Sequence, residues 1–156
     1  METQANTIET VFLGVVEKLA FMFGDPCDAN EIRDTPGSWV RATIEFEGTM
    51  TGSFSLTVPE ALCAEISANI LGLEPNDIAD SGLARDSLKE MLNVACGRVV
   101  PALQGAEHDF DLGVPFLDEL SHADVKELSG LEGVTCFDLD GSPIMLGLSL
   151  QGDEVC

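Results

Sequence analysis

Asp86-Ser-Leu-Lys-Glu90-Met-Leu-Asn93 is the segment that most constrains the fold of this chain. Apolar residues recur through it and beyond it at helical spacing, which predicts a long helix over residues 83–104. At about 100° per residue, positions 86, 90, 93 and 97 fall within roughly 60° of one another on that helix. We refer to Asp86, Glu90, Asn93 and Gly97 as the motif stripe. The opposite face is predicted to be buried and comprises Leu88, Met91, Leu92, Ala95, Val99, Ala102 and Leu103.

The motif stripe contains two residues that a merely solvated helix face would not favour. Asn93 is a mediocre helix former, and Gly97 costs about 1 kcal/mol relative to alanine inside a helix. We therefore expect a partner to approach this face closely, with Asp86 and Gly97 in its contact area. Lys89 lies at the edge of the stripe, where contact with the partner or a weak pair with Asp86 is expected rather than catalysis. An ordinary solvated face is the alternative interpretation.

Composition limits the class of protein. The chain has 156 residues and 45% hydrophobic content, which fits one domain over residues 1–156. Its formal charge of −21 disfavours binding to nucleic acid or to anionic membrane surfaces, because both would repel it. The acidity has two interpretations, which are solubility alone and a partner with a basic docking face.

The cysteines and the N-terminal region favour a cytoplasmic protein without a metal site. The N-terminus lacks the basic start of a signal peptide, and the apolar segment 11–23 is interrupted by polar residues, so no membrane span is expected. The five cysteines are odd in number and far apart, and only two histidines are present. This pattern argues against a disulfide framework and against a zinc or histidine metal centre.

The rest of the chain predicts further helices and strands. Helices are expected over residues 7–23 and 59–71, ended by Gly24 and Gly72. Alternating apolar and polar residues predict strands at 40–46, 50–58, 110–116, 133–139 and 143–150. Loops are expected at 25–37, 73–82 and 118–130, the last of them acidic and irregular.

Together these elements predict an α+β fold in which a largely antiparallel sheet packs against long helices. A helix followed by a strand pair occurs at 7–58 and again at 83–150, which indicates a weak internal duplication and a pseudo-duplicated sandwich. Pro115 predicts an edge position or a bulge in its strand. Pro101 predicts a kink or an early end of the long helix.

Several polar and aromatic residues have structural interpretations. Asp138 and Asp140 are expected at the turn of the last hairpin, because Asp140-Gly141 is a strong two-residue turn signal. Trp39 and the phenylalanines are expected in the core. Cys96, on the flank of the long helix, is expected to pack rather than react. The two histidines are expected at loops or strand ends.

The pattern Asp86-x3-Glu90-x2-Asn93, in a helix that precedes a strand with Leu112-Gly113-Val114-Pro115, resembles the CheX/CheC family of chemotaxis phosphatases. The resemblance implies that the substrate is the phosphorylated aspartate of a CheY-like response regulator. It implies that Glu90 pairs with the active-site lysine of the regulator and that Asn93 orients the attacking water. The Mg²⁺ would belong to the regulator, so no cofactor is expected on this chain.

The resemblance is to the single-site, CheX-like members of the family. CheC proteins usually carry a second site on the first long helix, where this chain has Thr10, Gly14 and Glu17 and no Glu-x-x-Asn. Glu65 and Asn69 have a three-residue gap and do not restore the pattern. CheX also implies a homodimer paired through sheet edges, here near Pro115 or Cys136. A non-catalytic docking or dimerisation module of the same fold remains the competing interpretation.

Overall fold

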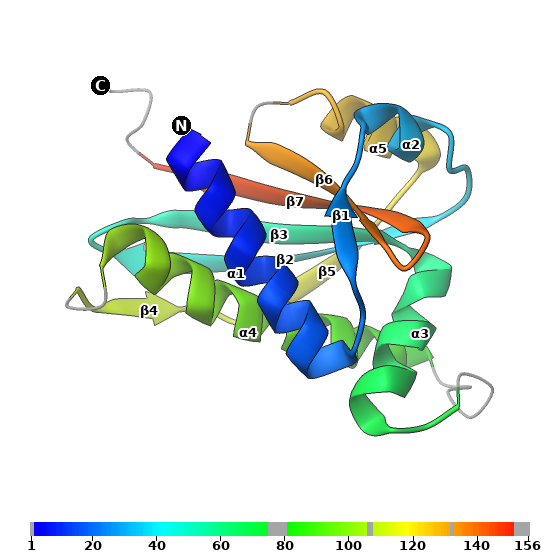
Figure 1. Cartoon of the computed structure of the whole chain (residues 1–156), viewed down its shortest axis with the longest axis horizontal. Helices are drawn as coiled ribbons and strands as arrows, with labels where there is room; N and C mark the ends of the chain where they lie inside the picture. The colour runs from blue at the N-terminus through cyan, green and yellow to red at the C-terminus, as the bar shows by residue number, and fades with distance from the viewer. Residues whose placement is uncertain (1, 75–80, 106–107, 132, 152–156) are drawn as a thin grey trace.

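The computed structural model describes residues 2–74, 81–105, 108–131 and 133–151. Its seven strands form one sheet in the order β1-β6-β7-β3-β2-β4, with β5 also paired to β2, and every pairing is antiparallel (Figure 1). The strands are β1 (Gly24–Pro26), β2 (Trp39–Gly48), β3 (Gly52–Pro59), β4 (Phe110–Leu112), β5 (Phe116–Leu120), β6 (Val134–Leu139) and β7 (Ser142–Leu150). The helices are α1 (Glu2–Ala20), α2 (Ala29–Arg33), α3 (Glu60–Leu71), α4 (Ser81–Gln104) and α5 (His122–Leu128).

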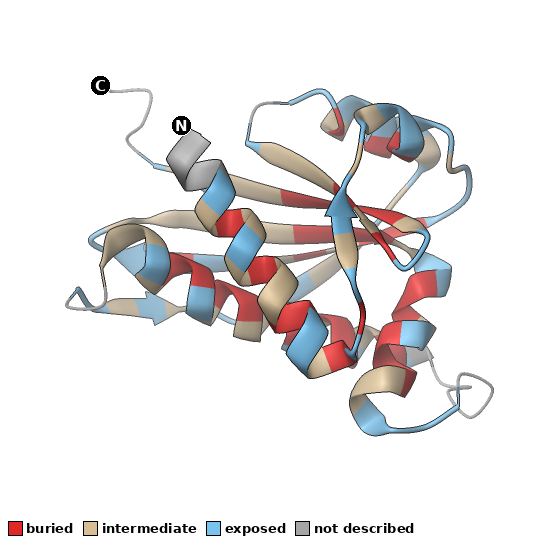
Figure 2. Ribbon diagram, in the orientation of Figure 1, coloured by how far each residue is buried: buried red, intermediate tan, exposed pale blue. Residues whose placement is uncertain are grey.

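Alternation along β2 sorts the helices onto the two faces of the sheet. Val40, Ala42 and Ile44 are fully buried in the main core, which the sheet shares with α1, α3 and α4. Trp39 points the other way and joins a smaller cluster with residues of α2, α5 and β7. Figure 2 shows the buried residues of α1 and α4 recurring along the helices, as the sequence periodicity predicts. The predicted α+β fold with a largely antiparallel sheet is confirmed.

The last hairpin has the predicted turn. Asp140 and Gly141 both have positive φ, +49° and +93°, as a tight two-residue hairpin turn requires. The Gly141 N–H donates to Asp138 Oδ1 at 2.7 Å, so Asp138 and Asp140 have the structural roles expected for them.

The predicted strand 110–116 is divided by a bulge. β4 and β5 both pair with β2, but between the pairs Phe46↔Leu112 and Thr43↔Phe116 the outer strand contributes one residue more than β2. An extra residue reverses which side chains face the core. Val114 and Phe116 are therefore exposed. Simple alternation over residues 110–116 would put them on the side of Phe110 and Leu112, and the expectation that Phe116 lies in the core is wrong. Pro115 lies at the edge of the sheet, as predicted.

Two predicted loops contain regular structure. Residues 25–37 include α2 and the end of β1, and residues 118–130 include part of β5 and all of α5. α5 begins with a capping box in which Ser121 and Asp124 exchange side-chain and backbone hydrogen bonds. The acidic composition of residues 118–130 concealed this start signal, so the prediction of irregular structure was wrong.

The first helix ends earlier than predicted. α1 ends at Ala20, and the next residue, Phe21, has a φ of +55°. Phe21 and Phe23 are both exposed, so the expectation that the phenylalanines lie in the core is wrong for these two as well as for Phe116. α4, by contrast, continues through Pro101 to Gln104.

No helix in the described part of the chain is long and apolar enough to cross a bilayer.

Candidate functional site

The motif stripe lies along one uninterrupted helix, as predicted. α4 runs without a break from Ser81 to Gln104, with Asp86 and Glu90 exposed and Asn93 and Gly97 half-buried. On the opposite side, the predicted core residues Leu88, Leu92, Ala95 and Val99 are completely buried. The stripe therefore points away from the sheet.

The buried face of α4 changes along the helix, and this corrects one prediction. Ala102 was expected in the core but is exposed, whereas Val100 is buried. α3 covers one side of α4 only near its N-terminal half, where Ser87 and Met91 are buried. Beyond that contact the same side of α4 is open, which is why Ala102 remains in solvent.

Two residues next to Asp86, Arg85 and Ser87, connect α4 to neighbouring elements. The Ser87 hydroxyl donates to the Ser67 hydroxyl of α3 at 2.9 Å, and both residues are buried. The Arg85 guanidinium donates to Glu119 of β5 at 2.7 Å and to Glu60 of α3 at 3.3 Å. The hydrogen bond with Glu119, and then that with Glu60, raises the pKa of Arg85 above its usual range.

The sequence reading missed Arg85 and Ser87 as positioning residues. Arg85 had one signal that could have revealed it, because it is one of 7 basic residues among 28 acidic ones. A basic residue so outnumbered is expected to pair with several carboxylates. Ser87 had no such signal, because its partner lies 20 residues away on another helix.

The polar side chains of the motif stripe have few interactions within the chain. Lys89 Nζ lies 3.8 Å from Asp86 Oδ1, and both side chains are substantially exposed. Such a pair contributes little to stability, as the sequence indicated. Among the described residues, none forms a hydrogen bond or an ion pair with the side chains of Glu90 or Asn93. Both polar groups are therefore open to an external partner.

Cys96 and Cys63, which are buried in the main core, have packing roles. Burial raises the pKa of Cys96 to about 12 and that of Cys63 to about 11. Both thiols therefore stay protonated at pH 8, and only the thiolate is a good nucleophile. We expect iodoacetamide to leave both unmodified in the folded protein and to modify both after denaturation, as read residue by residue by mass spectrometry. Rapid labelling of Cys96 in the folded protein would contradict its packed position.

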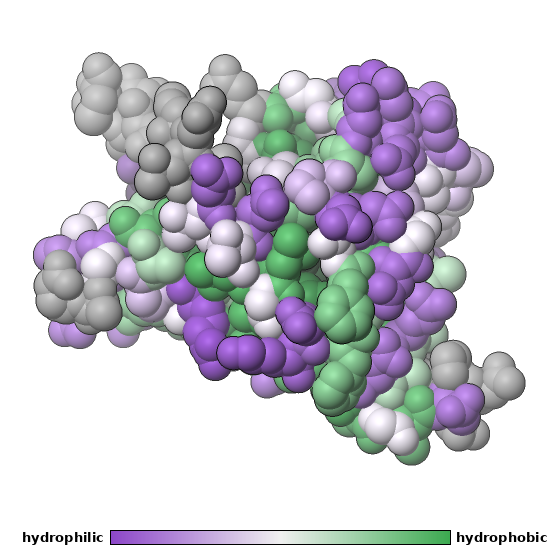
Figure 3. All heavy atoms as spheres, in the orientation of Figure 1, coloured by the Kyte–Doolittle hydropathy of each residue, from purple (hydrophilic) through white to green (hydrophobic). Residues whose placement is uncertain are grey.

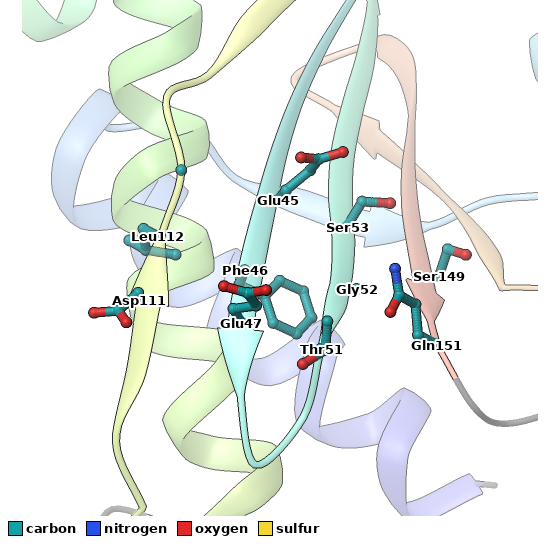
Figure 4. A pocket seen from close by; sticks show the side chains of 11 residues that line it. Glu45, Phe46, Glu47, Thr51, Gly52, Ser53, Asp111, Leu112, Ser149 and Gln151 are labelled. Atoms are coloured by element: carbon teal, nitrogen blue, oxygen red, sulfur yellow. The ribbon is translucent and has the colours of Figure 1, made fainter.

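A pocket lies on the side of the sheet away from α4. It has a volume of about 420 Å³ and is lined by polar side chains that include Glu45, Ser53 and Ser149 (Figure 4). In Figure 4 these three side chains project from the sheet on the side opposite to the helices drawn behind it. The motif stripe is thus separate from this concavity and lies on a convex helix surface, which suits a macromolecular partner better than a small molecule.

The described residues contain no group of three or more His, Cys, Asp or Glu side chains arranged to hold a metal ion. His122 is instead engaged with the backbone, since its Nε2 lies 2.8 Å from the Arg33 carbonyl oxygen.

The family of the chain follows from a comparison of its sequence. The family model of the chemotaxis phosphatase CheX matches residues 40–137, which include the whole motif stripe and most of the sheet. The chain therefore belongs to the CheX family of chemotaxis phosphatases. A comparison with curated proteins found no significant match.

Solved structures confirm the fold. The chain is similar to a chemotaxis protein CheX from Desulfovibrio desulfuricans, with 18% identity and a TM-score of 0.69 over 96% of this chain and 99% of that one. A CheX from Vibrio vulnificus is 22% identical, with a TM-score of 0.70 over 95% of this chain and 96% of that one. A CheX solved in complex with CheY, BeF₃ and Mg²⁺ from Borrelia burgdorferi is 15% identical, with a TM-score of 0.67 over 94% of this chain and 96% of that one.

Proposed function

We propose that this protein dephosphorylates the phospho-aspartate of a CheY-like response regulator, using Glu90 and Asn93 of α4. The observation that carries the proposal is the stripe itself, in which Glu90 and Asn93 share one open face of a helix within the matched family region. A relative in the Borrelia complex is bound to CheY, which supports the same class of partner here.

The two side chains suit separate tasks. Hydrolysis of an acyl phosphate mainly requires that water be positioned and charge be stabilised. An amide can donate and accept hydrogen bonds without repelling phosphoryl oxygens, so Asn93 would orient the water. A carboxylate close to the phosphoryl group would repel it. Glu90, about one turn away, would instead pair with the lysine of the regulator and set the docked register.

Magnesium enters this proposal only through the partner. The Mg²⁺ would be bound by the regulator, and no residue of this chain is assigned to it. The cysteine pattern is the basis for expecting a cytoplasmic location, and this protein would bind the regulator in that compartment.

The direct test is a phosphatase assay. The CheY-like receiver domains of the organism that encodes this chain would be phosphorylated with a small acyl phosphate or phosphoramidate donor. Loss of the phosphoryl group would then be followed with and without this protein, in the presence of Mg²⁺. At least one receiver should lose its phosphoryl group faster when the protein is present. If binding occurs without acceleration, the docking-module interpretation replaces the enzymatic one.

Gly97 provides a prediction in which stability and activity change in opposite directions. A Cβ at Gly97 would meet no atom within 4 Å, so packing within the chain does not require glycine there. Gly97→Ala should therefore raise the free energy of unfolding by about 1 kcal/mol. It should also weaken binding of the regulator, because the added methyl group occupies the space of the approaching partner. Thermal unfolding and a binding titration measure the two effects, and unchanged binding would remove Gly97 from the interface.

A homodimer joined through sheet edges is a further part of this proposal. The outer edge of the sheet is formed by β4 and β5 around Pro115. At the opposite edge β1 pairs with Phe137–Leu139 of β6, and the Cys136 carbonyl accepts from the Cys27 N–H at 3.1 Å, so this pairing ends at Cys136. Two chains of charge −21 repel each other, so the dimer should become more stable as salt increases. Light scattering at several salt concentrations measures this. A monomer at high micromolar protein in physiological salt would contradict it.

A further inference from the structure

The turn that follows α1 presents two phenylalanines to solvent. Phe21 is 68% exposed and Phe23 is 65% exposed, whereas the adjacent Ala20 and Met22 are buried. An aromatic side chain left mostly in water contributes little of the burial that normally stabilises a fold. The exposure of both rings therefore indicates a role outside the folding of this chain.

The backbone at Phe21 is unusual for such a large residue. Phe21 has a φ of +55°, and its N–H donates to the Glu17 carbonyl at 3.1 Å, which is a left-handed helix cap that glycine usually supplies. α3 is followed by Gly72 at φ +72°, and α4 is followed by Gly105 at φ +102°. A bulky side chain in this conformation is strained. Among these three long helices, α1 alone has a phenylalanine where the others have glycine.

Phe23 is held by the turn of the last hairpin. Its N–H donates to Asp140 Oδ1 at 3.1 Å, and the Asp140 N–H donates to the Phe23 carbonyl at 3.0 Å. The next residue, Gly24, is packed so tightly that a Cβ there would lie 2.8 Å from Leu13 Cδ2. The backbone that carries the rings is therefore fixed before any partner arrives, which lowers the entropy lost on binding.

The side of α1 that leads to this turn is also exposed to solvent. Thr10, Gly14 and Glu17 follow one another at the spacing of the first three residues of the motif stripe on α4, and none of the three is buried. Both helices pack their other sides into the same core. The exposed sides of α1 and α4 therefore both face away from the sheet.

The same turn lies near the N-terminal half of the motif helix. Figure 1 shows α1 crossing α4 and ending beside α3, and α1 contacts both of these helices. α3 is in turn joined to the N-terminal half of α4 by the bond between Ser67 and Ser87. The end of α1 thus borders the half of α4 that carries Asp86 and Glu90.

Two leucines extend the apolar surface along α3. Leu71 is 46% exposed and Leu73 is 45% exposed at the C-terminal end of that helix. Figure 3 shows apolar atoms continuing from the end of α1 toward the lower end of α3, with polar atoms on both sides. A continuous apolar patch with a polar border is typical of an interaction surface.

We propose that Phe21 and Phe23 form an aromatic anchor for the receiver domain of the response regulator, which rests on it while the phospho-aspartate faces Asn93. This inference depends on the proposed function and adds the contact that supplies affinity. The motif stripe offers few apolar groups of its own. The aromatic anchor supplies them from a neighbouring helix, in a position fixed relative to the stripe.

The position of the aromatic anchor beside the motif helix points to the receiver as its occupant, and charge favours an apolar contact there. The chain carries −21, and phosphorylation adds negative charge to the receiver, so long-range attraction contributes little to the complex. Short-range burial must therefore supply the affinity, and aromatic residues are those that most often do so at interfaces. A second copy of this chain is a poorer occupant, because it brings another −21 to the contact.

The test separates binding from catalysis. The probe is a CheY-like receiver domain activated with beryllofluoride and Mg²⁺, and the variants are Phe21→Gly, Phe23→Ala and the double substitution. The double variant should bind the activated receiver about tenfold or more weakly, as expected for loss of aromatic interface residues. Its dephosphorylation rate at saturating concentration should stay near that of the wild type. Leu131→Ala, which removes another exposed apolar side chain (57% exposed) beyond α5, is the control and should bind normally.

The same set of variants distinguishes a folding defect from a failure of the aromatic-anchor proposal. Phe21→Gly should melt at or above the wild-type temperature, because glycine relieves the left-handed backbone. Wild-type affinity in the double variant would overturn the aromatic anchor while leaving the phosphatase function intact. A change in self-association, rather than in receiver affinity, would likewise overturn it. Failure of the proposed function appears differently, as a wild-type protein that binds activated receivers without accelerating dephosphorylation of any of them.

Discussion

Replacing Asn93 with alanine is expected to remove most of the phosphatase activity, lowering the rate at saturating regulator by about 10² to 10³. The amide is the group proposed to orient the attacking water. Its neighbours on the stripe, Asp86 and Glu90, are carboxylates and cannot replace it beside a phosphoryl group. Binding of the activated receiver should change little, because one small side chain contributes little contact. Loss of phosphate from the regulator, measured at saturating regulator concentration, gives the rate.

The same substitution should leave the fold intact or slightly more stable. Asn93 is half-buried, and alanine is the better helix former by about 0.5 kcal/mol. Asn69→Ala is the matched control, since it removes the same half-buried amide from the neighbouring helix α3 and should retain the wild-type rate. A wild-type rate for Asn93→Ala would show that α4 does not perform the chemistry. The docking-module interpretation would then apply.

The periodicity of the sequence was sufficient to locate the motif helix and its two faces. Leu88, Leu92 and Val99 recur at helical spacing, and burial of this set leaves the motif stripe outside. The β2–β3 and β6–β7 hairpins could also be predicted from the sequence, because alternation and turn residues are local signals. These features depend on residues close together in the chain.

What the sequence did not reveal depends on contacts between distant segments. The bulge before Phe116 is defined only by its pairing with β2, so alternation alone placed Phe116 on the wrong face. Ala102 looks apolar in sequence, but α3 is too short to cover it. The capping box at Ser121 is a local signal that the sequence does contain, but it lies within an acidic segment whose composition is typical of a loop.

The same distinction applies to the candidate site. Glu90 and Asn93 could be proposed from a local pattern. Arg85, which links α4 to Glu60 and Glu119, required knowledge of which elements meet at the N-terminal end of α4. Phe21 was expected in the core only because phenylalanine is a residue type that is usually buried. Its left-handed backbone, which moves the ring outward, has no signal in sequence.

Glu90→Ala is expected to reduce both docking and rate, in contrast to Asn93→Ala. The proposed ion pair between Glu90 and the active-site lysine of the regulator sets the register in which Asn93 reaches the phosphoryl group. Loss of a charged partner at an interface costs about 2 kcal/mol or more, which corresponds to an affinity at least about thirtyfold weaker. The affinity for the activated receiver and the rate at saturation measure the two effects. Glu127→Ala removes an equally exposed carboxylate from α5 and should change neither quantity.

A double-mutant cycle distinguishes a specific ion pair from a general effect of charge. Glu90→Ala would be combined with alanine at the active-site lysine of the receiver, and all four affinities would be measured. If the two groups pair, the second substitution should cost little once the first partner is absent, giving a coupling free energy close to the cost of the single substitution, about 2 kcal/mol. Additive effects would show that Glu90 contacts some other group. Tighter binding by Glu90→Ala would show that the carboxylate only adds to the repulsion between two acidic proteins, and its role in setting the docked register would have to be abandoned.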